Sequence, residues 1–297
     1  MNNTPACLFC NSTKATEFTA FEDTIFNNKT FKYLGCKDCD LIYVFPSPTD
    51  DDIIKMYPVE YQGEIVTKKT GGYDALLNKI KETGSYKTLL DYGCGNGRFI
   101  KEAIDEGYEI TGAEYNPEIV TNLKKAYSSV QFFTVDHLLA LNDKYDIIFL
   151  SNVIEHLTQP KQILNQLKDK LNENGIFVLE GPVENNFNIA LIFRKLIFSI
   201  RKFIFNKKAQ HIPLHLFYSN RKNQEQLFKD IGLTTIYFEI NESSWPFPSN
   251  YNECDSLNKK ITYFIASFSV FMSKITRGWG NNFIYIGKCI KPKTINN

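Results

Sequence analysis

The sequence predicts an α/β protein with a doubly wound, mostly parallel sheet behind a small metal-binding module. Apolar strands alternate with amphipathic helices from Thr88 onward, which is typical of a parallel sheet. Two C-x2-C pairs stand ahead of this alternation, at residues 7–10 and 36–39. Since 43% of the 297 residues are hydrophobic, the chain can bury a substantial core.

Four of the seven cysteines form two matched pairs with the spacing of a zinc site. These are Cys7, Cys10, Cys36 and Cys39. Two C-x2-C turns can point four thiolates at one tetrahedral ion. A redox pair would normally stand alone at the start of a helix. The sequence therefore predicts a structural zinc ion with no open coordination position, because all four ligands are cysteines.

The remaining chain divides at a proline-broken turn over residues 45–52. We expect a zinc-binding module at 1–48, a helical linker region at 49–84 and the main domain at 85–297. The strands predicted in the main domain are 88–92, 108–114, 130–135, 145–151 and 175–180, with helices at 97–106, 117–127 and 160–171. Parallel sheets of this kind bind ligands at the carboxyl ends of their strands.

A glycine-rich loop, Gly93-Cys-Gly-Asn-Gly97, joins the first strand of this domain to its first helix. Arg98 occupies the place of the third glycine of a dinucleotide fingerprint, and the absence of a G-K-[ST] sequence excludes a P-loop. Acidic residues end three successive strands. Asp91 suits a cationic ammonium group, Glu114 suits a pair of ribose hydroxyls, and Asp136 suits an adenine amino group.

The segment from Leu89 to about Gly181 resembles the class I S-adenosylmethionine-dependent methyltransferases. The resemblance is carried by Asp91 to Gly97, Glu114, Asp136 and Ser151-Asn-Val-Ile-Glu-His-Leu157, and it continues less specifically through His211 to Ser219 and strands at 234–240 and 282–290. It implies a Rossmann-like seven-stranded sheet, its last strand antiparallel, and S-adenosylmethionine as cofactor. It also implies cofactor-binding roles for Asp91, Gly93, Gly95, Gly97, Glu114, Asp136, Ser151 and Asn152. The four-cysteine head is similar to a subgroup associated with polysaccharide or other secondary biosynthesis.

Methyl transfer to a hydroxyl group requires a base, and histidine is the natural base near neutral pH. His215, His156 and His211 are the candidates, whereas we expect His137 to be an incidental loop residue. Glu155-His156 also resembles an E-x-x-E-H motif that binds a divalent cation in other O-methyltransferases. Asn152 stands where that motif has its first glutamate, so a catalytic cation is left open.

Two apolar segments interrupt the predicted domain, at about 185–215 and 255–277. Residues 187–206 predict an amphipathic helix with a basic face, which fits either a membrane interface or a lid over the acceptor pocket. The second segment, centred on 261–272, is too short to span a bilayer and is expected to join the first in a helical cap.

These features predict a methyltransferase that modifies an oxygen of a sugar-containing or lipid-like small molecule. Transfer to carbon or nitrogen remains open, as does a non-catalytic cofactor-binding protein that docks a partner through its zinc module. The net charge of +1 argues against a nucleic-acid substrate, although the zinc module and the basic helix leave a nucleic-acid modifier open. No signal peptide is visible, so we expect a cytoplasmic protein that contacts a membrane surface at most peripherally. The oligomeric state is left open.

Overall fold

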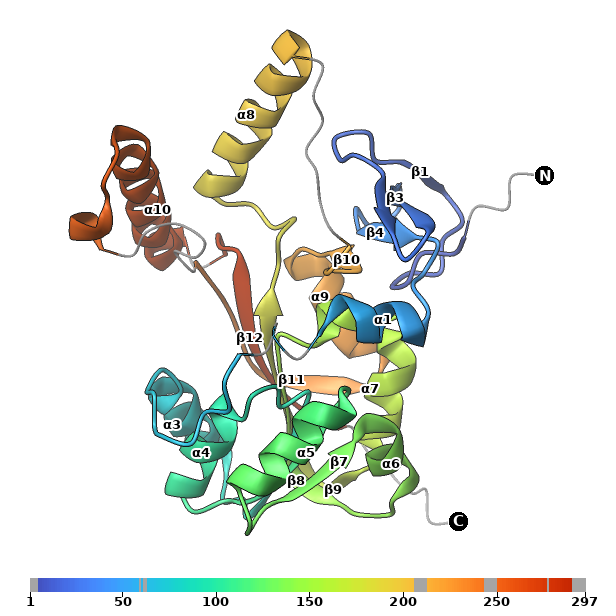
Figure 1. The fold of residues 1–297 in the computed structure, drawn as a ribbon, viewed down its shortest axis with the longest axis vertical. Coiled ribbons are helices and arrows are strands. Elements are labelled where there is room, and N and C mark those ends of the chain that lie inside the picture. Colours follow the sequence, from blue (N-terminus) through green and yellow to red (C-terminus); the bar gives the residue numbers. More distant parts are fainter. Residues whose placement is uncertain are drawn as a thin grey trace. The chain divides into compact units, whose positions relative to one another are not determined.

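The computed structural model describes residues 5–58, 60, 63–205, 213–242, 250–276 and 278–289, and they form two compact units (Figure 1). Unit 1 comprises Met1–Ser47, Gly181–Leu227 and Phe238–Ile284. Unit 2 comprises Pro48–Glu180, Phe228–Tyr237 and Tyr285–Asn297. This division differs from the expected one, because unit 1 unites the N-terminal module with both segments that were expected to form the helical cap.

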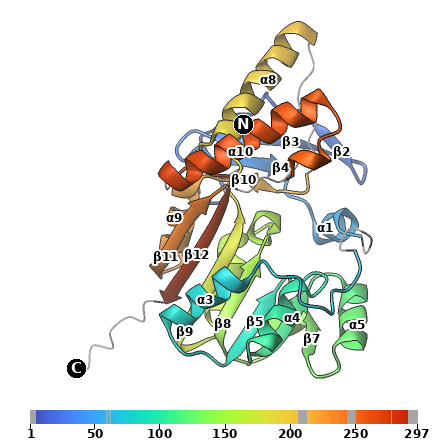
Figure 2. The same ribbon diagram turned by 90° about the vertical axis from the view of Figure 1, so that its left-hand side faces the viewer.

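The predicted seven-stranded sheet is confirmed (Figure 2). Its strands are β5 (Thr88–Tyr92), β6 (Glu109–Glu114), β7 (Gln131–Thr134), β8 (Tyr145–Ser151), β9 (Leu171–Pro182), β11 (Leu233–Asn241) and β12 (Asn282–Cys289). They lie in the order β11-β12-β9-β8-β5-β6-β7. β5 pairs in parallel with β6 and β8, β6 with β7, and β8 with β9. The sheet therefore reverses its winding at β5, where doubly wound folds place their ligands.

The central strands form the core of unit 2. Leu89 and Leu90 of β5 are completely buried, as are residues 147–150 of β8 and 176–179 of β9. Strands covered on both faces read as continuous apolar runs instead of alternating with polar residues. This burial explains why the sequence shows these strands so clearly.

The helices of unit 2 follow the predicted alternation. They are α1 (Asp50–Met56), α3 (Asp74–Thr83), α4 (Arg98–Asp105), α5 (Pro117–Ala126), α6 (Val135–Ala140) and α7 (Pro160–Lys168). α4, α5 and α7 lie within the predicted helices. α6 was missed, because it begins at the residue directly after β7 and no turn residue separates the two elements.

Unit 1 contains a small antiparallel sheet. Its strands are β1 (Ala15–Glu17), β2 (Thr24–Phe26), β3 (Lys29–Cys36), β4 (Ile42–Phe45) and β10 (Phe217–Tyr218). β3 pairs with β1, β2 and β4, and β10 pairs with β4. Aromatic rings support this pairing, since the ring of Phe9 lies 4.8 Å from that of Phe217 and Phe21 lies 5.3 Å from Tyr218. Residues 217–218 thus complete the sheet of the N-terminal module.

Unit 1 also carries two long helices, α8 (Ile189–Phe205) and α10 (Leu257–Thr276), which contact each other. A third helix, α9 (Arg221–Asp230), follows β10. Among the described residues, no helix combines the length and apolar character that crossing a bilayer requires.

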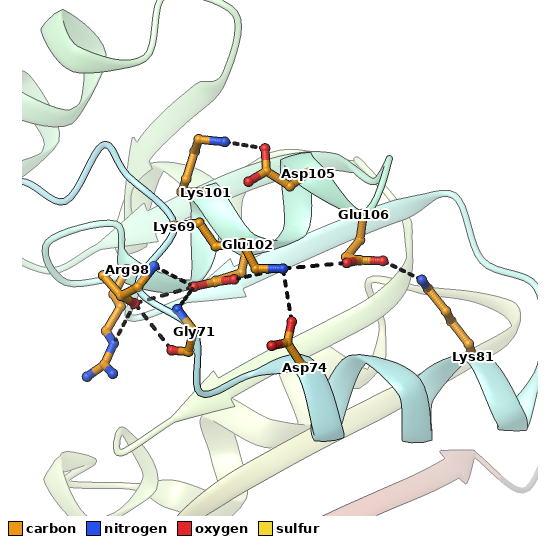
Figure 3. A network of polar contacts seen from close by, with 10 residues as sticks. Lys69, Gly71, Asp74, Lys81, Arg98, Lys101, Glu102, Asp105 and Glu106 are labelled. Carbon is orange, nitrogen blue, oxygen red and sulfur yellow. Dashed lines mark hydrogen bonds and ion pairs between the residues drawn. The ribbon is translucent and has the colours of Figure 1, made fainter.

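A buried carboxylate ties the segment before α3 to α4 (Figure 3). Glu102 of α4 accepts hydrogen bonds from the backbone N–H groups of Thr70, at 2.9 Å, and Gly71, at 2.8 Å. Its other oxygen lies 3.7 Å from Lys69, whose ammonium also pairs with Asp74 at 2.9 Å. Since residues 69–71 lead directly into α3, Glu102 fixes the start of that helix.

We expect Glu102→Ala to lower the free energy of unfolding by about 1–3 kcal/mol, because two backbone donors lose their acceptor. The matched control is Glu106→Ala, which removes a more exposed acid from the same helix and the same network. Its surface pairs predict a loss of about 0–1 kcal/mol. Urea unfolding measures both values, and equal losses would contradict the role given to Glu102.

Candidate functional site

Unit 2 contains a cavity of about 500 Å³ at the carboxyl ends of its parallel strands. This volume lies within the usual range for small-molecule and cofactor sites. Its lining includes every predicted cofactor residue except one. These lining residues are Asp91, Gly93, Gly95, Glu114, Asp136, Ser151 and Asn152. Gly97 is absent from the lining and instead stands directly before α4.

Two glycines of the loop are required by conformation and by close packing. Gly93 has a φ of +80°, and a Cβ at this position would lie 2.4 Å from the Cγ2 atom of Val153. Gly97 has a φ of +82°, and its Cβ would lie 2.9 Å from the side chain of Leu123. A side chain at either position would meet steric conflict as well as backbone strain. The loop can therefore keep its path along the cavity only with glycine at these places.

Glu114 is buried at the end of β6 and is held by backbone donors. Its carboxylate accepts hydrogen bonds from the N–H groups of Gly95, at 2.8 Å, Tyr115, at 2.8 Å, and Asn116, at 3.3 Å. Burial raises the pKa of Glu114, and the backbone donors act in the opposite direction. These contacts fix the carboxylate between the glycine loop and the start of α5.

Asp91 is buried at the end of β5, and its Oδ2 atom has no hydrogen-bond partner among the described residues. Burial raises the pKa of Asp91 well above its usual value, and the nearby charges of Glu114 and Glu180 raise it further. A buried carboxylate without a partner is costly. A ligand that donates a hydrogen bond to the Oδ2 atom of Asp91 would remove this cost.

Ser151 and Asn152 follow at the end of β8. Ser151 donates a hydrogen bond of 2.5 Å to Glu180, and the side chain of Asn152 donates one of 3.2 Å to Ser151. Asn152 is exposed and has a φ of +52°. Asp136 is exposed in the first turn of α6 and faces the same cavity.

Sequence reasoning missed Glu180 and Tyr73, as well as a further tyrosine described below. Glu180 lies at the end of the buried run 176–179 of β9, so the signal that singled out Asp91 and Glu114 was also present here. Burial raises its pKa, whereas the hydrogen bond from Ser151 and the charge of Arg98 lower it. Tyr73 lines the cavity, and burial raises its pKa to about 12. Tyr73 carries no comparable sequence signal, because it precedes an ordinary surface helix.

A tyrosine–histidine pair lies at another part of the cavity lining. The hydroxyl of Tyr57 lies 2.5 Å from the Nδ1 atom of His156, and both residues line the cavity. The Nε2 atom of His156 lies 3.6 Å from a carboxylate oxygen of Glu155, which is buried behind it and does not line the cavity. Tyr57 directly follows α1, whose start is fixed by a capping box between Thr49 and Asp52. Sequence reasoning did not identify Tyr57.

His215, the first candidate base, belongs to unit 1. Its Nδ1 atom lies 2.7 Å from the carboxylate of Glu184 in the same unit. His211 lies outside the described residues. His137 is exposed in α6, where its ring lies 5.1 Å from that of Phe133.

The four cysteines of unit 1 gather as their spacing predicts. All four sulfur atoms lie within 4.8 Å of one another, and none forms a disulfide. The two C-x2-C turns share one geometry. Asn11 donates its backbone N–H to the carbonyl of Cys7 at 3.0 Å, and Asp40 does the same to Cys36 at 3.1 Å. Both of these residues have a positive φ, so the two cysteine pairs lie in two separate tight turns of the same type.

The methyltransferase domain family matches residues 67–237, which is more than half of the chain. The chain belongs to this family of methyltransferase domains. The predicted methyltransferase family is therefore confirmed.

Curated relatives match a shorter stretch. The tRNA U34 carboxymethyltransferase of Campylobacter jejuni strain 81-176 is 28% identical over 137 residues, which cover 40% of this chain and 44% of that protein. The protein of the same name from Campylobacter lari is 29% identical over 136 residues, with the same coverage. The chain thus spans less than half the length of these relatives.

Solved structures show the same fold at low sequence identity. An N-methyltransferase of Haemonchus contortus, in complex with phosphomonomethylethanolamine and S-adenosylhomocysteine, matches 84% of this chain and 62% of its own with 14% identity and a TM-score of 0.50. A methyltransferase from Archaeoglobus fulgidus matches 72% of this chain and 91% of its own with 18% identity and a TM-score of 0.47.

Proposed function

We propose that the cavity of unit 2 binds S-adenosylmethionine and that the enzyme methylates an oxygen atom of a sugar-containing or lipid-like small molecule. The observation that carries the cofactor site is the unpartnered oxygen of Asp91. The methionine part of the cofactor has an ammonium group, which would supply the missing donor together with a positive charge. A phosphate-rich ligand would worsen the repulsion among Asp91, Glu114 and Glu180.

The remaining predicted residues support the same ligand. The fixed carboxylate of Glu114 suits the two ribose hydroxyls, and Asp136 suits the adenine amino group. Ser151 and Asn152 lie beside Glu180 and line the same cavity. Bound S-adenosylmethionine supplies an activated methyl group, so the protein must align the acceptor, exclude water and remove a proton.

Calorimetric titration with S-adenosylmethionine and S-adenosylhomocysteine tests the site. We expect Asp91→Asn to weaken binding by about 2–5 kcal/mol, because a buried charge loses its partner. Glu114→Gln should cost about 1.5–3 kcal/mol. Binding should also weaken as the pH falls toward the raised pKa of Asp91, since the protonated carboxyl no longer attracts an ammonium group.

Asp143→Asn is the matched control, because Asp143 is an exposed acid outside the cavity. The Asp143→Asn variant should bind S-adenosylmethionine and S-adenosylhomocysteine with the affinity of the unchanged protein. If Asp91→Asn left saturable binding unchanged, the carboxylate of Asp91 would not be the group that binds the ammonium group of the cofactor. A folded protein that binds neither compound would refute the cofactor site as a whole.

We propose that Tyr57, His156 and Glu155 act together to remove the proton from the acceptor hydroxyl. A neutral histidine within 2.5 Å of a tyrosine hydroxyl can receive a proton, and a neighbouring carboxylate stabilises the resulting cation. Tyr57 or His156 would then take the proton from the acceptor hydroxyl. The role of His215 as base and the use of a divalent cation stay predictions.

We expect Tyr57→Phe and His156→Gln each to lower kcat by about 100- to 10,000-fold, the usual contribution of general base catalysis. Affinity for S-adenosylhomocysteine should remain unchanged. The matched control is His137→Gln, an exposed histidine in α6. The assay is release of S-adenosylhomocysteine with the most active acceptor from a panel of phosphorylated sugars, nucleotide sugars and lipid-linked sugars. Full activity of both variants would exclude this base.

Transfer to tRNA is the second candidate, and it is favoured by the name of the Campylobacter relatives. The balance of 34 basic and 33 acidic residues favours a small molecule, because nucleic-acid enzymes usually carry a basic surface. Adding total tRNA to the acceptor panel separates the two. Turnover with tRNA alone would overturn the small-molecule proposal.

We also propose that the four cysteines of unit 1 hold a structural zinc ion. The sulfur atoms of Cys7 and Cys39 lie 3.6 Å apart, and those of Cys10 and Cys36 lie 3.5 Å apart. A tetrahedral ion with Zn–S bonds of about 2.3 Å separates its ligands by about 3.8 Å, so the cluster needs only a small expansion.

We expect Cys36→Ser to lower the zinc content well below one ion per chain and to destabilise unit 1, because the metal contributes much of the folding energy of so small a module. Cys254→Ser is the control, since Cys254 is buried in the same unit but outside the cluster. Atomic emission spectroscopy and thermal unfolding provide the measurements. A fully folded protein purified without zinc would contradict the proposal.

A further inference from the structure

Helix α10 has its side chains arranged opposite to those of an ordinary surface helix. The residues that it buries are small, namely Ala266, Ser269 and Ser273. The residues that it exposes are large and apolar, and they recur every three or four positions along its whole length. These are Leu257 (73% exposed), Ile261 (48%), Phe264 (61%), Phe268 (54%), Phe271 (57%) and Ile275 (60%). A contiguous apolar stripe of this size marks an interaction surface.

Helix α8 presents a second apolar stripe in the same unit. Its exposed members are Ile192, Phe193, Leu196, Ile200, Phe203 and Ile204, and Phe203 is 92% exposed. α8 and α10 contact each other, and both helices are labelled in Figures 1 and 2. Both stripes expose their apolar side chains to solvent. The expectation that the two segments form a helical cap stays a prediction.

The charge of the two helices is entirely positive. α8 contains Arg194, Lys195, Arg201 and Lys202, α10 contains Lys259, Lys260 and Lys274, and neither helix contains an acidic residue. Some of these groups have local partners, since Lys259 pairs with Asp255 at 2.8 Å and Lys260 lies 5.6 Å from the centre of the Tyr251 ring. Lys274 is exposed near the end of α10.

This charge decides between two occupants of the surface. The spacing of the α10 stripe would also suit a coiled coil with a second copy of the chain. Such pairing would bring two wholly basic helices together with no acidic residue on either to neutralise them, so like charges would oppose it. An anionic bilayer surface offers apolar depth for the phenylalanines and negative charge for the lysines and arginines.

We propose that α8 and α10 dock unit 1 on a membrane surface that contains anionic lipid, with α10 lying in the plane of the interface. Since no described helix is suited to cross a bilayer, the contact is peripheral. The proposal is independent of the methyl acceptor, because it rests on the surface of unit 1 and not on the cavity of unit 2.

Flotation of the full-length protein with vesicles tests this proposal. We expect binding to vesicles of phosphatidylcholine mixed with phosphatidylglycerol, little binding to phosphatidylcholine alone, and weaker binding at high salt. Phe268→Asp should lower the vesicle affinity about tenfold or more, because a buried phenyl ring is lost. Lys274→Glu should lower it about fivefold or more through lost attraction to the lipid charge.

The matched control is Ile25→Asp. Ile25 is an apolar residue of unit 1 that is more exposed than Phe268, at 77%, but it lies in β2 and belongs to neither helix. It should bind vesicles as the unchanged protein does. Far-ultraviolet circular dichroism and titration with S-adenosylhomocysteine confirm that each variant is folded and that unit 2 is intact.

Three outcomes would overturn the proposal. The first is a folded, unchanged protein that binds neither kind of vesicle. The second is equal binding by Phe268→Asp and Ile25→Asp. The third concerns the oligomeric state without vesicles. If light scattering shows that the unchanged protein is a dimer and that the Phe268→Asp variant is a monomer, the surface binds a second copy of the chain.

Discussion

Three carboxylates meet near the carboxyl ends of parallel strands in unit 2, and the charges of Glu114 and Glu180 act on the buried carboxylate of Asp91. A parallel sheet brings the carboxyl ends of its strands to one edge, so Asp91, Glu114 and Glu180 come close together as a consequence of topology. Glu114 receives three backbone donors, and Glu180 receives Ser151 and the charge of Arg98. Of these three carboxylates, only that of Asp91 has a buried oxygen for which no donor exists among the described residues.

The surrounding elements hold this edge in place. Gly93 and Gly97 allow the loop to turn where a side chain would collide with Val153 or Leu123. Glu102 then anchors residues 70–71 to α4, and Tyr73, which lines the cavity, directly precedes α3. The helix that follows the glycine loop therefore also restrains the segment before α3.

The sequence predicted the bounds of strands best where both faces of the strand are buried. β5 and β8 have the predicted bounds, because strands covered on both faces are plain apolar runs ending in polar residues. The acidic strand ends were recognisable for the same reason, although Glu180 was overlooked. Tyr57 and Tyr73 could not be recognised, since each reaches the cavity from a segment that precedes the sheet in sequence. Their positions depend on tertiary packing that leaves no local pattern.

Unit 1 shows a different limit of prediction from sequence. The C-x2-C pairs predicted the cysteine cluster, but nothing in residues 217–218 indicates that they pair with β4. A two-residue strand is too short to carry a periodic signal. The apolar stripes of α8 and α10 were visible, yet the sequence does not say whether an apolar stripe faces a core or the solvent. The small residues on the buried side of α10 gave the only hint.

The unpartnered oxygen of Asp91 has a consequence for how turnover is regulated. In the proposed binding mode this carboxylate holds the ammonium group, and that group is the same before and after the methyl group has left. The strongest electrostatic contact of the site therefore does not distinguish the reactant from the demethylated product. An enzyme built in this way is subject to product inhibition, so its rate follows the ratio of the two compounds more closely than the amount of either.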